Sequence, residues 1–198
     1  GFDEWFSSPN FYDNDPVMSR EGKAVRTIGE SSMVIVDAAL EFIKGRSEKK
    51  KPFLAVIWFG SPHNPYIAEE QDRMLYSGEE EKMQNYYGEI TGMDRAIGKL
   101  RQELKSLGIS ENTLVWYCSD NGGLAGFGST GGRGAKSQIY EGGLIVPAII
   151  EWPVKIKTSR ITHSPSNTSV IYPTLLQLVG VPIEDHYPAN GVSPFPLI

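Results

Sequence analysis

The sequence predicts an α/β fold, with a mixed, largely parallel sheet that has helices on both faces. Two observations support this. Residues 53–59 and 113–118 are continuous apolar runs of strand length, which is typical of strands buried on both faces. Between them, residues 84–107 repeat apolar side chains at the spacing of a helix. Strands that alternate with long helices favour parallel strands joined by helical crossovers.

The first half of the chain adds a loop and two helical regions. Residues 1–30 are rich in Ser, Pro, Asn, Asp and aromatic side chains and are expected to be irregular. Ser31 or Ser32 is expected to cap a helix over about 33–44. Residues 69–107 are largely helical in pattern, and Gly108 is the expected helix stop. The apolar stripes of the two helices are Met33, Val36, Leu40 and Ile43, then Tyr86, Ile90, Met93, Ile97, Leu100 and Leu104.

The second half of the chain is expected to contain shorter helices and strands than the first. Residues 122–134 form a glycine-rich loop, and residues 145–152 are expected to form a strand that Pro147 interrupts early. Asn167 or Thr168 is expected to cap a short helix that runs through Val179. The tail from residue 181 is rich in proline and expected to be irregular.

Composition limits the classes of function. A chain of 198 residues is long enough for one domain with a sizeable core, and its net charge of -5 argues against a nucleic-acid surface. The single cysteine, Cys118, excludes an internal disulfide and a cysteine-based zinc site. No apolar run reaches the length of a membrane span.

Asp120 and Asn121 are the most informative pair. They follow the 113–118 run directly and precede Gly122 and Gly123. A carboxylate and an amide at the end of a core strand supply two hard oxygen ligands, of the kind that Ca²⁺ or Mg²⁺ prefers. Ligands of α/β folds bind outside the carboxyl ends of strands. The same four residues also make an ordinary turn.

His63 is a candidate because it lies just beyond the end of the 53–59 run, between two prolines. Histidines in general are mostly structural or on the surface. Here, two strand ends would each present a polar group to the same crevice. A histidine in that place can donate a proton to a leaving group or bind an anion.

Lys136 is a candidate because it follows the glycine-rich segment GGRGA at residues 131–135. A lysine on such a loop can reach an oxyanion as a point charge, although the loop alone favours a solvated lysine. The segment does not match a nucleotide-binding P-loop, since Thr130 and Ala135 occupy its required glycine positions.

Three ordered motifs resemble those of the type I sulfatases, which belong to the alkaline phosphatase superfamily. They are GSPHNP at residues 60–65, YCSDNGG at 117–123, and a lysine five residues before the glutamate of YEGGLIVP at 140–147. The segments at residues 1–6, 88–94 and 172–176 also fit this family. The resemblance therefore extends over nearly all of the chain.

The resemblance implies a role for each candidate. Asp120 and Asn121 match the family's second pair of Ca²⁺ ligands, with Mg²⁺ the lesser alternative. His63 matches the histidine near the sulfate and its leaving oxygen. Lys136 matches the lysine that neutralises a sulfate oxygen. The implied activity is the hydrolysis of a sulfuric ester by a formylglycine nucleophile, on a sulfated small molecule or a sulfated glycan.

The sequence departs from the family because the Cys/Ser-x-Pro/Ala-x-Arg motif that becomes formylglycine is missing. Cys118 is followed by Ser119 and Asp120, so it cannot replace that motif. The family's first pair of metal-binding aspartates and its small C-terminal sheet subdomain are also missing. We therefore expect residues 1–198 to be a single partial domain, incomplete at both ends, with no nucleophile. Formylglycine is expected upstream of residue 1, and the chain alone is expected to be inactive.

Two alternatives remain. The first is a phosphonate or phosphodiester hydrolase of the same superfamily, but those members often place histidine after the metal-binding aspartate, so Asn121 favours a sulfatase. The second is a non-catalytic relative that binds a metal or a sulfated ligand. The family suggests a periplasmic or secreted location, which the sequence itself leaves unknown.

Overall fold

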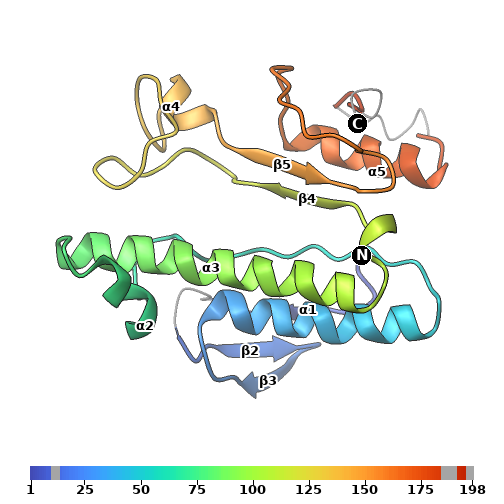
Figure 1. Ribbon diagram of the computed structural model, residues 1–198, viewed down its shortest axis with the longest axis horizontal. Helices are drawn as coiled ribbons and strands as arrows, with labels where there is room; N and C mark the ends of the chain where they lie inside the picture. Colours follow the sequence, from blue (N-terminus) through green and yellow to red (C-terminus); the bar gives the residue numbers. More distant parts are fainter. Residues whose placement is uncertain (10–13, 184–190, 195–198) are drawn as a thin grey trace. The chain divides into compact units, whose positions relative to one another are not determined.

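The computed structural model describes residues 1–9, 14–183 and 191–194. It divides the chain into two compact units, Gly1–Ser110 and Glu111–Ile198, which are described one at a time (Figure 1). The expectation of a single partial domain stays a prediction. No helix of the described residues combines the length and apolar character that a membrane span needs.

The first unit opens with a small antiparallel sheet of three strands, β1 (Phe6–Ser7), β2 (Val17–Arg20) and β3 (Lys23–Arg26). Glu21 and Gly22 join β2 to β3 with positive φ angles of 52° and 86°, as a two-residue hairpin turn requires. The expectation that residues 1–30 are irregular is therefore wrong. Their strands are only two to four residues long, too short to give a recognisable alternation.

Helix α1 (Ser31–Glu48) contains the predicted helix and is longer at both ends. Its N-cap is Glu30, not Ser31 or Ser32 as the sequence suggested. The Glu30 carboxylate accepts hydrogen bonds from the backbone N–H groups of Ser32 and Met33, at 2.8 and 3.0 Å. A glutamate can cap in this way because its longer side chain reaches the same two amides that a serine would satisfy.

Helix α3 (Glu81–Ser106) lies beside α1, and a short helix α2 (Glu70–Arg73) with the single turn η1 (Met74–Tyr76) precedes it (Figure 1). The α3 helix stops where predicted, since Gly108 adopts a φ of 69°. Ion pairs from Lys44 to Glu103 and from Lys99 to Asp37 connect the two long helices. The buried apolar side chains of β2, α1 and α3 are Met18, Val36, Leu40, Ile43, Met93, Ala96, Leu100 and Leu104.

Residues 53–59 do not form the buried strand that their apolar run predicts. The structure places no strand between β3 and the 115–118 segment, but exposure alternates along the run as in an extended chain. Leu54, Val56 and Trp58 are exposed, and the residues between them are half-buried. Only one face of the run meets the helices, as shown by the edge-to-face contact of Phe53 with Phe42 of α1.

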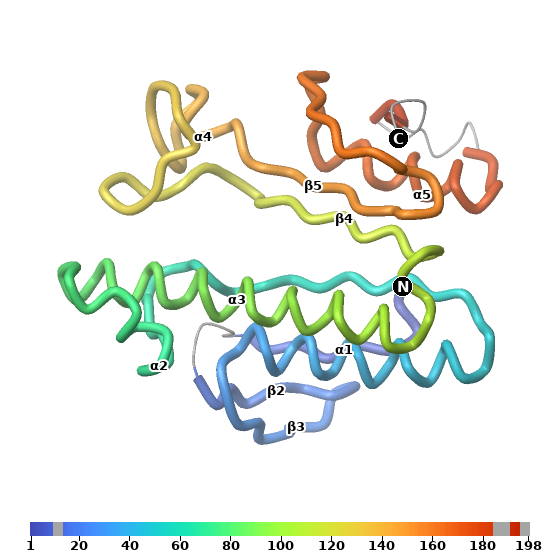
Figure 2. The backbone as a smooth tube through the Cα atoms, in the orientation of Figure 1, coloured from blue at the N-terminus to red at the C-terminus, as the bar shows by residue number. Residues whose placement is uncertain are grey.

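The second unit is built on a pair of antiparallel strands, β4 (Val115–Cys118) and β5 (Ala148–Glu151), preceded by a single turn η2 (Ser110–Asn112). Their register places Val115 opposite Glu151 and Cys118 opposite Ala148. Between them the chain forms the glycine-rich loop and a short helix α4 (Glu141–Leu144), as Figure 2 shows. All ladders recorded for residues 1–9, 14–183 and 191–194 are antiparallel.

The last helical region confirms its predicted start. Asn167 caps it, since its side-chain oxygen accepts a hydrogen bond from the backbone of Ser169 at 2.9 Å. A single turn η3 (Thr168–Val170) leads into α5 (Ile171–Val179). Most of the predicted irregular tail lies outside the described residues.

Candidate functional site

The end of β4 presents the predicted pair of oxygen ligands. Asp120 is exposed and Asn121 is half-buried. The amide nitrogen of Asn121 donates to the carbonyl of Gly122 at 3.2 Å, which leaves the amide oxygen Oδ1 as the atom suited to a cation. The Ser119 hydroxyl donates to the carbonyl of Asn121 at 3.0 Å and fixes the turn.

The loop after this pair packs through glycines, with backbone against backbone. A Cβ atom at Gly122 would lie 1.9 Å from the carbonyl oxygen of Gly142. A Cβ at Gly142 would lie 2.1 Å from the oxygen of Gly134, and one at Gly143 would lie 2.2 Å from that of Gln138. No side chain fits at such distances, so these glycines are required by close approach rather than by a turn alone.

Lys136 is brought next to the strand end by this packing. Its backbone N–H donates to the carbonyl of Gly123 at 2.8 Å, two residues beyond Asn121. The Gly122 N–H donates to the carbonyl of Gly143 at 3.0 Å and closes the loop from the other side. The structure therefore assembles Asp120, Asn121 and Lys136 into one loop cluster, which the sequence spacing alone did not establish.

Two cations of this loop differ in what they contact. The guanidinium of Arg133 lies over the ring of Tyr140, 4.0 Å from its centre. Lys136 is half-buried, and no ion pair involves it among the described residues. The Arg133 guanidinium thus contacts an aromatic ring inside the loop, and the role of Lys136 toward an anionic ligand stays a prediction.

His63 lies in the first unit, on the exposed loop that follows residues 53–59. Its Nδ1 is 2.7 Å from the carbonyl oxygen of Asn64, which can only accept, so the ring proton lies on Nδ1. Nε2 is then the nitrogen that would meet a substrate. Because His63 belongs to a different unit from Asp120, Asn121 and Lys136, its predicted place beside them stays a prediction.

The sequence analysis missed the buried carboxylate that supports the His63 loop. Glu89 of α3 is only 2% exposed, and its Oε1 accepts a hydrogen bond from the backbone N–H of Ile67 at 2.6 Å. The pKa of Glu89 is raised to about 7, chiefly by burial and also by the nearby Glu30, while the hydrogen bonds of the Ile67 N–H and the Ser61 hydroxyl lower it. The available signal was Gly88, since a glycine in a helix interior can mark a close approach.

The donor set at the end of β4 fits part of a site for a hard cation. Asp120 offers a carboxylate and Asn121 an amide oxygen, both suited to Ca²⁺. Within residues 1–9, 14–183 and 191–194, no group of three or more His, Cys, Asp or Glu side chains is arranged to hold a metal. The chemistry of the pair therefore fits two positions of such a coordination shell, and its assignment as metal ligands stays a prediction.

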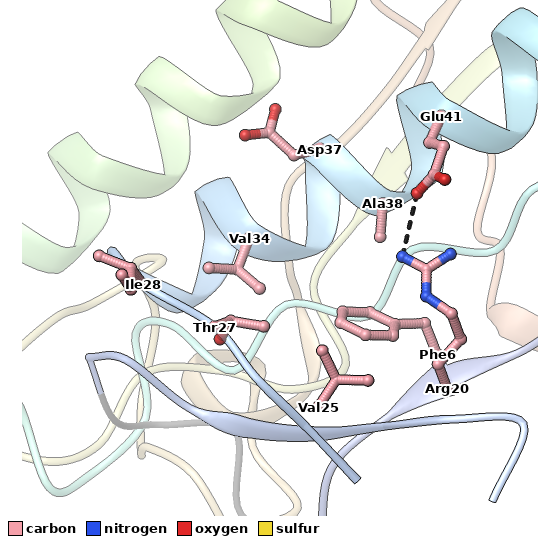
Figure 3. A pocket seen from close by; sticks show the side chains of 9 residues that line it. All are labelled: Phe6, Arg20, Val25, Thr27, Ile28, Val34, Asp37, Ala38 and Glu41. Carbon is pink, nitrogen blue, oxygen red and sulfur yellow. Dashed lines mark hydrogen bonds and ion pairs between the residues drawn. The ribbon is translucent and has the colours of Figure 1, made fainter. Parts of the chain in front are cut away.

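A shallow pocket of about 260 Å³ lies elsewhere in the first unit, between the small sheet and α1 (Figure 3). Arg20 in this pocket lies over the ring of Phe6 and forms an ion pair with Glu41 at 3.0 Å. None of the predicted site residues lines it. Its one arginine is already neutralised, so the pocket offers no free cation to an anionic substrate.

Comparison with known proteins gives one family. Residues 1–181 match the family model described as Sulfatase. The chain is 30% identical over 221 residues to an ulvan-active sulfatase of Formosa agariphila, covering 98% of this chain and 42% of the relative. It is 29% identical over 213 residues to the N-acetylgalactosamine-6-sulfatase of Canis lupus familiaris, covering 91% of this chain and 39% of that protein.

Solved structures agree with the sequence comparison. The crystal structure of Ps i-CgsB in complex with k-i-k-neocarrahexaose superposes with a TM-score of 0.84 at 28% identity, over 91% of this chain and 41% of that one. A structure from work on glycosaminoglycan metabolism by Bacteroides thetaiotaomicron gives 0.83 at 27% identity, over 100% and 45%. These likenesses confirm the α/β fold class. The chain spans about two fifths of the length of the curated relatives named above.

Proposed function

Because this chain belongs to the sulfatase family, we propose that the complete protein is a sulfuric ester hydrolase that acts on a sulfated glycan. The observation that carries the proposal is the loop cluster, in which the Lys136 N–H···O=C Gly123 bond ties a cation to the strand end of Asp120 and Asn121. A sulfate ester needs both a positive charge for its non-bridging oxygens and a metal-binding end, and this cluster offers both.

We assign Asp120 and Asn121 as two ligands of Ca²⁺, in preference to Mg²⁺, because the exposed carboxylate and free amide oxygen suit a flexible oxygen shell. When bound, the ion would supply positive charge toward the oxygens of the sulfate group. Lys136 would neutralise one of these oxygens as a point charge. The formylglycine nucleophile would come from a segment outside these 198 residues.

His63 would act on the leaving oxygen. With its Nδ1 proton held by the Asn64 carbonyl, the imidazolium form would present its second proton on Nε2. Transfer of that proton would stabilise the departing alcohol. This role requires that the His63 loop and the Lys136 loop meet in the complete protein.

The choice of a glycan as the substrate class comes from the relatives. Two of them are named for carbohydrate substrates: the ulvan-active sulfatase for a polysaccharide and the N-acetylgalactosamine-6-sulfatase for an amino sugar. A third, 27% identical over 213 residues, is an endo-4-O-sulfatase of Bacteroides thetaiotaomicron. A sulfated small molecule is the second candidate.

The Asp120→Ala variant of the complete protein tests the metal assignment. We expect hydrolysis of an aryl sulfate to fall by about a hundredfold or more, because one charged ligand of the cation is removed. The rise in thermal midpoint that added Ca²⁺ causes in the wild type should disappear in the same variant. Glu111→Gln, which also removes an exposed carboxylate of this unit, is the matched control and should leave both readouts unchanged. A Ca²⁺ response that survives in Asp120→Ala contradicts the ligand assignment.

A further inference from the structure

We propose that Glu89 is a positioning residue, which holds the loop that carries His63 against helix α3. The proposal rests on the proposed function for what His63 does, but the contact that holds the loop stands without it. Glu89 lies in the first half of α3 and is 2% exposed. Its Oε1 accepts the backbone N–H of Ile67 at 2.6 Å, four residues after His63.

The carboxylate also acts on the beginning of the same loop. Ser61, two residues before His63, is 8% exposed, and its hydroxyl favours the ionised form of Glu89. One side chain therefore faces both ends of the 61–67 segment, and the exposed His63 lies between them.

A glycine of α3, Gly88, makes this approach possible. A Cβ at Gly88 would lie 2.6 Å from the Cβ of Ala68 and 3.1 Å from the backbone nitrogen of Arg73. A Cβ at Gly92 would lie 3.4 Å from the Glu30 side chain. The contact at Gly92 is an ordinary van der Waals distance, so Gly88 is the position whose missing side chain lets the end of the loop lie on the helix and reach Glu89.

Neutral contacts support the same segment. Asn85 of α3 accepts the N–H of Ala68 at 3.2 Å, and the amide of Asn14 donates to the carbonyl of Ile67 at 3.2 Å. The rings of Tyr66 and Tyr86 meet at 5.2 Å. Glu89 differs from these groups because it ionises near neutral pH, and a bond from an N–H to a carboxylate is about twice as strong as one to a neutral oxygen.

The surroundings of Glu89 place its titration near neutral pH. Burial is the largest cause that raises its pKa to about 7, and Glu30 at the start of α1 adds to it. Tyr66 faces it from the loop, and the Arg95–Asp72 ion pair lies beside Glu30. As the pH rises through 7, Glu89 gains its charge, which strengthens its hydrogen bond with the Ile67 N–H but leaves a carboxylate buried, so the free energy of unfolding falls.

Two substitutions in the complete protein separate positioning from general stability. Glu89→Met removes the acceptor at similar volume, and Glu89→Gln keeps an acceptor oxygen but cannot ionise. We expect Glu89→Met to raise hydrogen exchange of the 61–70 peptide about tenfold or more while that of α1 stays unchanged. The kcat for an aryl sulfate should fall with little change in KM, because His63 acts on the leaving group rather than on binding.

Glu89→Gln should restore slow exchange and most of kcat, and should remove the step near pH 7 from the pH–rate profile. Glu81→Gln, at an exposed position of the same helix, is the control and should match the wild type. Unchanged exchange of the 61–70 peptide in Glu89→Met overturns the proposal, as does an equal rise throughout the first unit. If the wild-type protein hydrolyses no sulfate ester, the proposed function fails, but the exchange experiment still decides whether Glu89 holds the loop.

Discussion

The two loops that carry the predicted cations are held in opposite ways. The His63 loop is held by side chains, since Glu89, Asn85 and Asn14 reach its backbone from neighbouring elements. The Lys136 loop is held by its own backbone, with Gly122 and Gly123 bonded to residues 143 and 136. The contacts of the His63 loop include a carboxylate that can be protonated, and each of them can be weakened separately by substitution. The contacts of the Lys136 loop require that its glycines carry no side chain.

This difference teaches how each loop should respond to change. A loop held by a carboxylate responds to pH, because the strength of its main contact depends on ionisation. A loop held by backbone bonds across glycines has no titrating contact, so pH leaves it unaffected and a single added methyl group breaks it. The predictions below test these two behaviours.

The largest effect is expected from Gly122→Ala. The new Cβ would lie 1.9 Å from the Gly142 oxygen, so the loop must open, and we expect a loss of roughly 4 kcal/mol or more in unfolding free energy. Urea unfolding of the complete protein measures it. Gly98→Ala makes the same change in α3, where nothing lies within 4 Å, and should stabilise by about 0.5–1 kcal/mol. Equal stability of the two variants would mean that the glycine contact is not needed.

The next effect concerns pH. The folded pKa of Glu89 is raised from 4.5 to about 7, so the folded state holds this proton more tightly than the unfolded state. The resulting stability is fully present below pH 4.5 and is lost as the pH rises to about 7, with a limit of about 3 kcal/mol. The unfolding free energy of the wild type minus that of Glu89→Gln should therefore decline over this window. A difference that stays constant from pH 4.5 to 7 contradicts the raised pKa.

The smallest effect is expected from Asn85→Ala, which removes the acceptor of the Ala68 N–H. The loss should be about 1 kcal/mol, as for one neutral hydrogen bond. Asn85→Asp keeps an acceptor oxygen and is the matched control. Hydrogen exchange at Ala68 should increase in the first variant and stay slow in the second. Fast exchange in both would assign the restraint to Glu89 alone.

The helices and the strand ends could be predicted from the sequence because apolar spacing and turn residues are local signals. Helix α3, the stop at Gly108 and the Asn167 cap were found in this way. The small sheet at the start was missed because its strands are too short for alternation to be recognised. The apolar run at 53–59 was wrongly expected to be buried on both faces, because an apolar pattern does not say which neighbours will cover it.

The candidate site was predicted in part. Asp120, Asn121 and Lys136 carry their chemistry in their own side chains, so their motif singled them out; the structure bonds the Lys136 backbone to Gly123, two residues beyond Asn121, and their roles stay a prediction. The neighbouring Gly88 marked a close approach to α3, but not that Glu89 would be buried beside Ile67, which is 22 residues away along the chain. A glutamate next to an apolar stripe is otherwise typical of a solvated helix face.

The crossing of backbone at Gly122, Gly142 and Gly143 also limits how this loop can diverge among descendants of the sequence. Any other residue at these positions would place a Cβ against a backbone oxygen, so these glycines cannot be replaced without disrupting the loop. The exposed Ser129 and Thr130 of the same loop carry no such constraint. New substrate preferences would therefore have to arise at exposed loop residues such as Ser129 and Thr130, while the packed glycines that hold the Lys136 loop stay unchanged. In saturation mutagenesis of this loop, Gly122, Gly142 and Gly143 should tolerate almost no substitution, whereas the exposed positions should tolerate many.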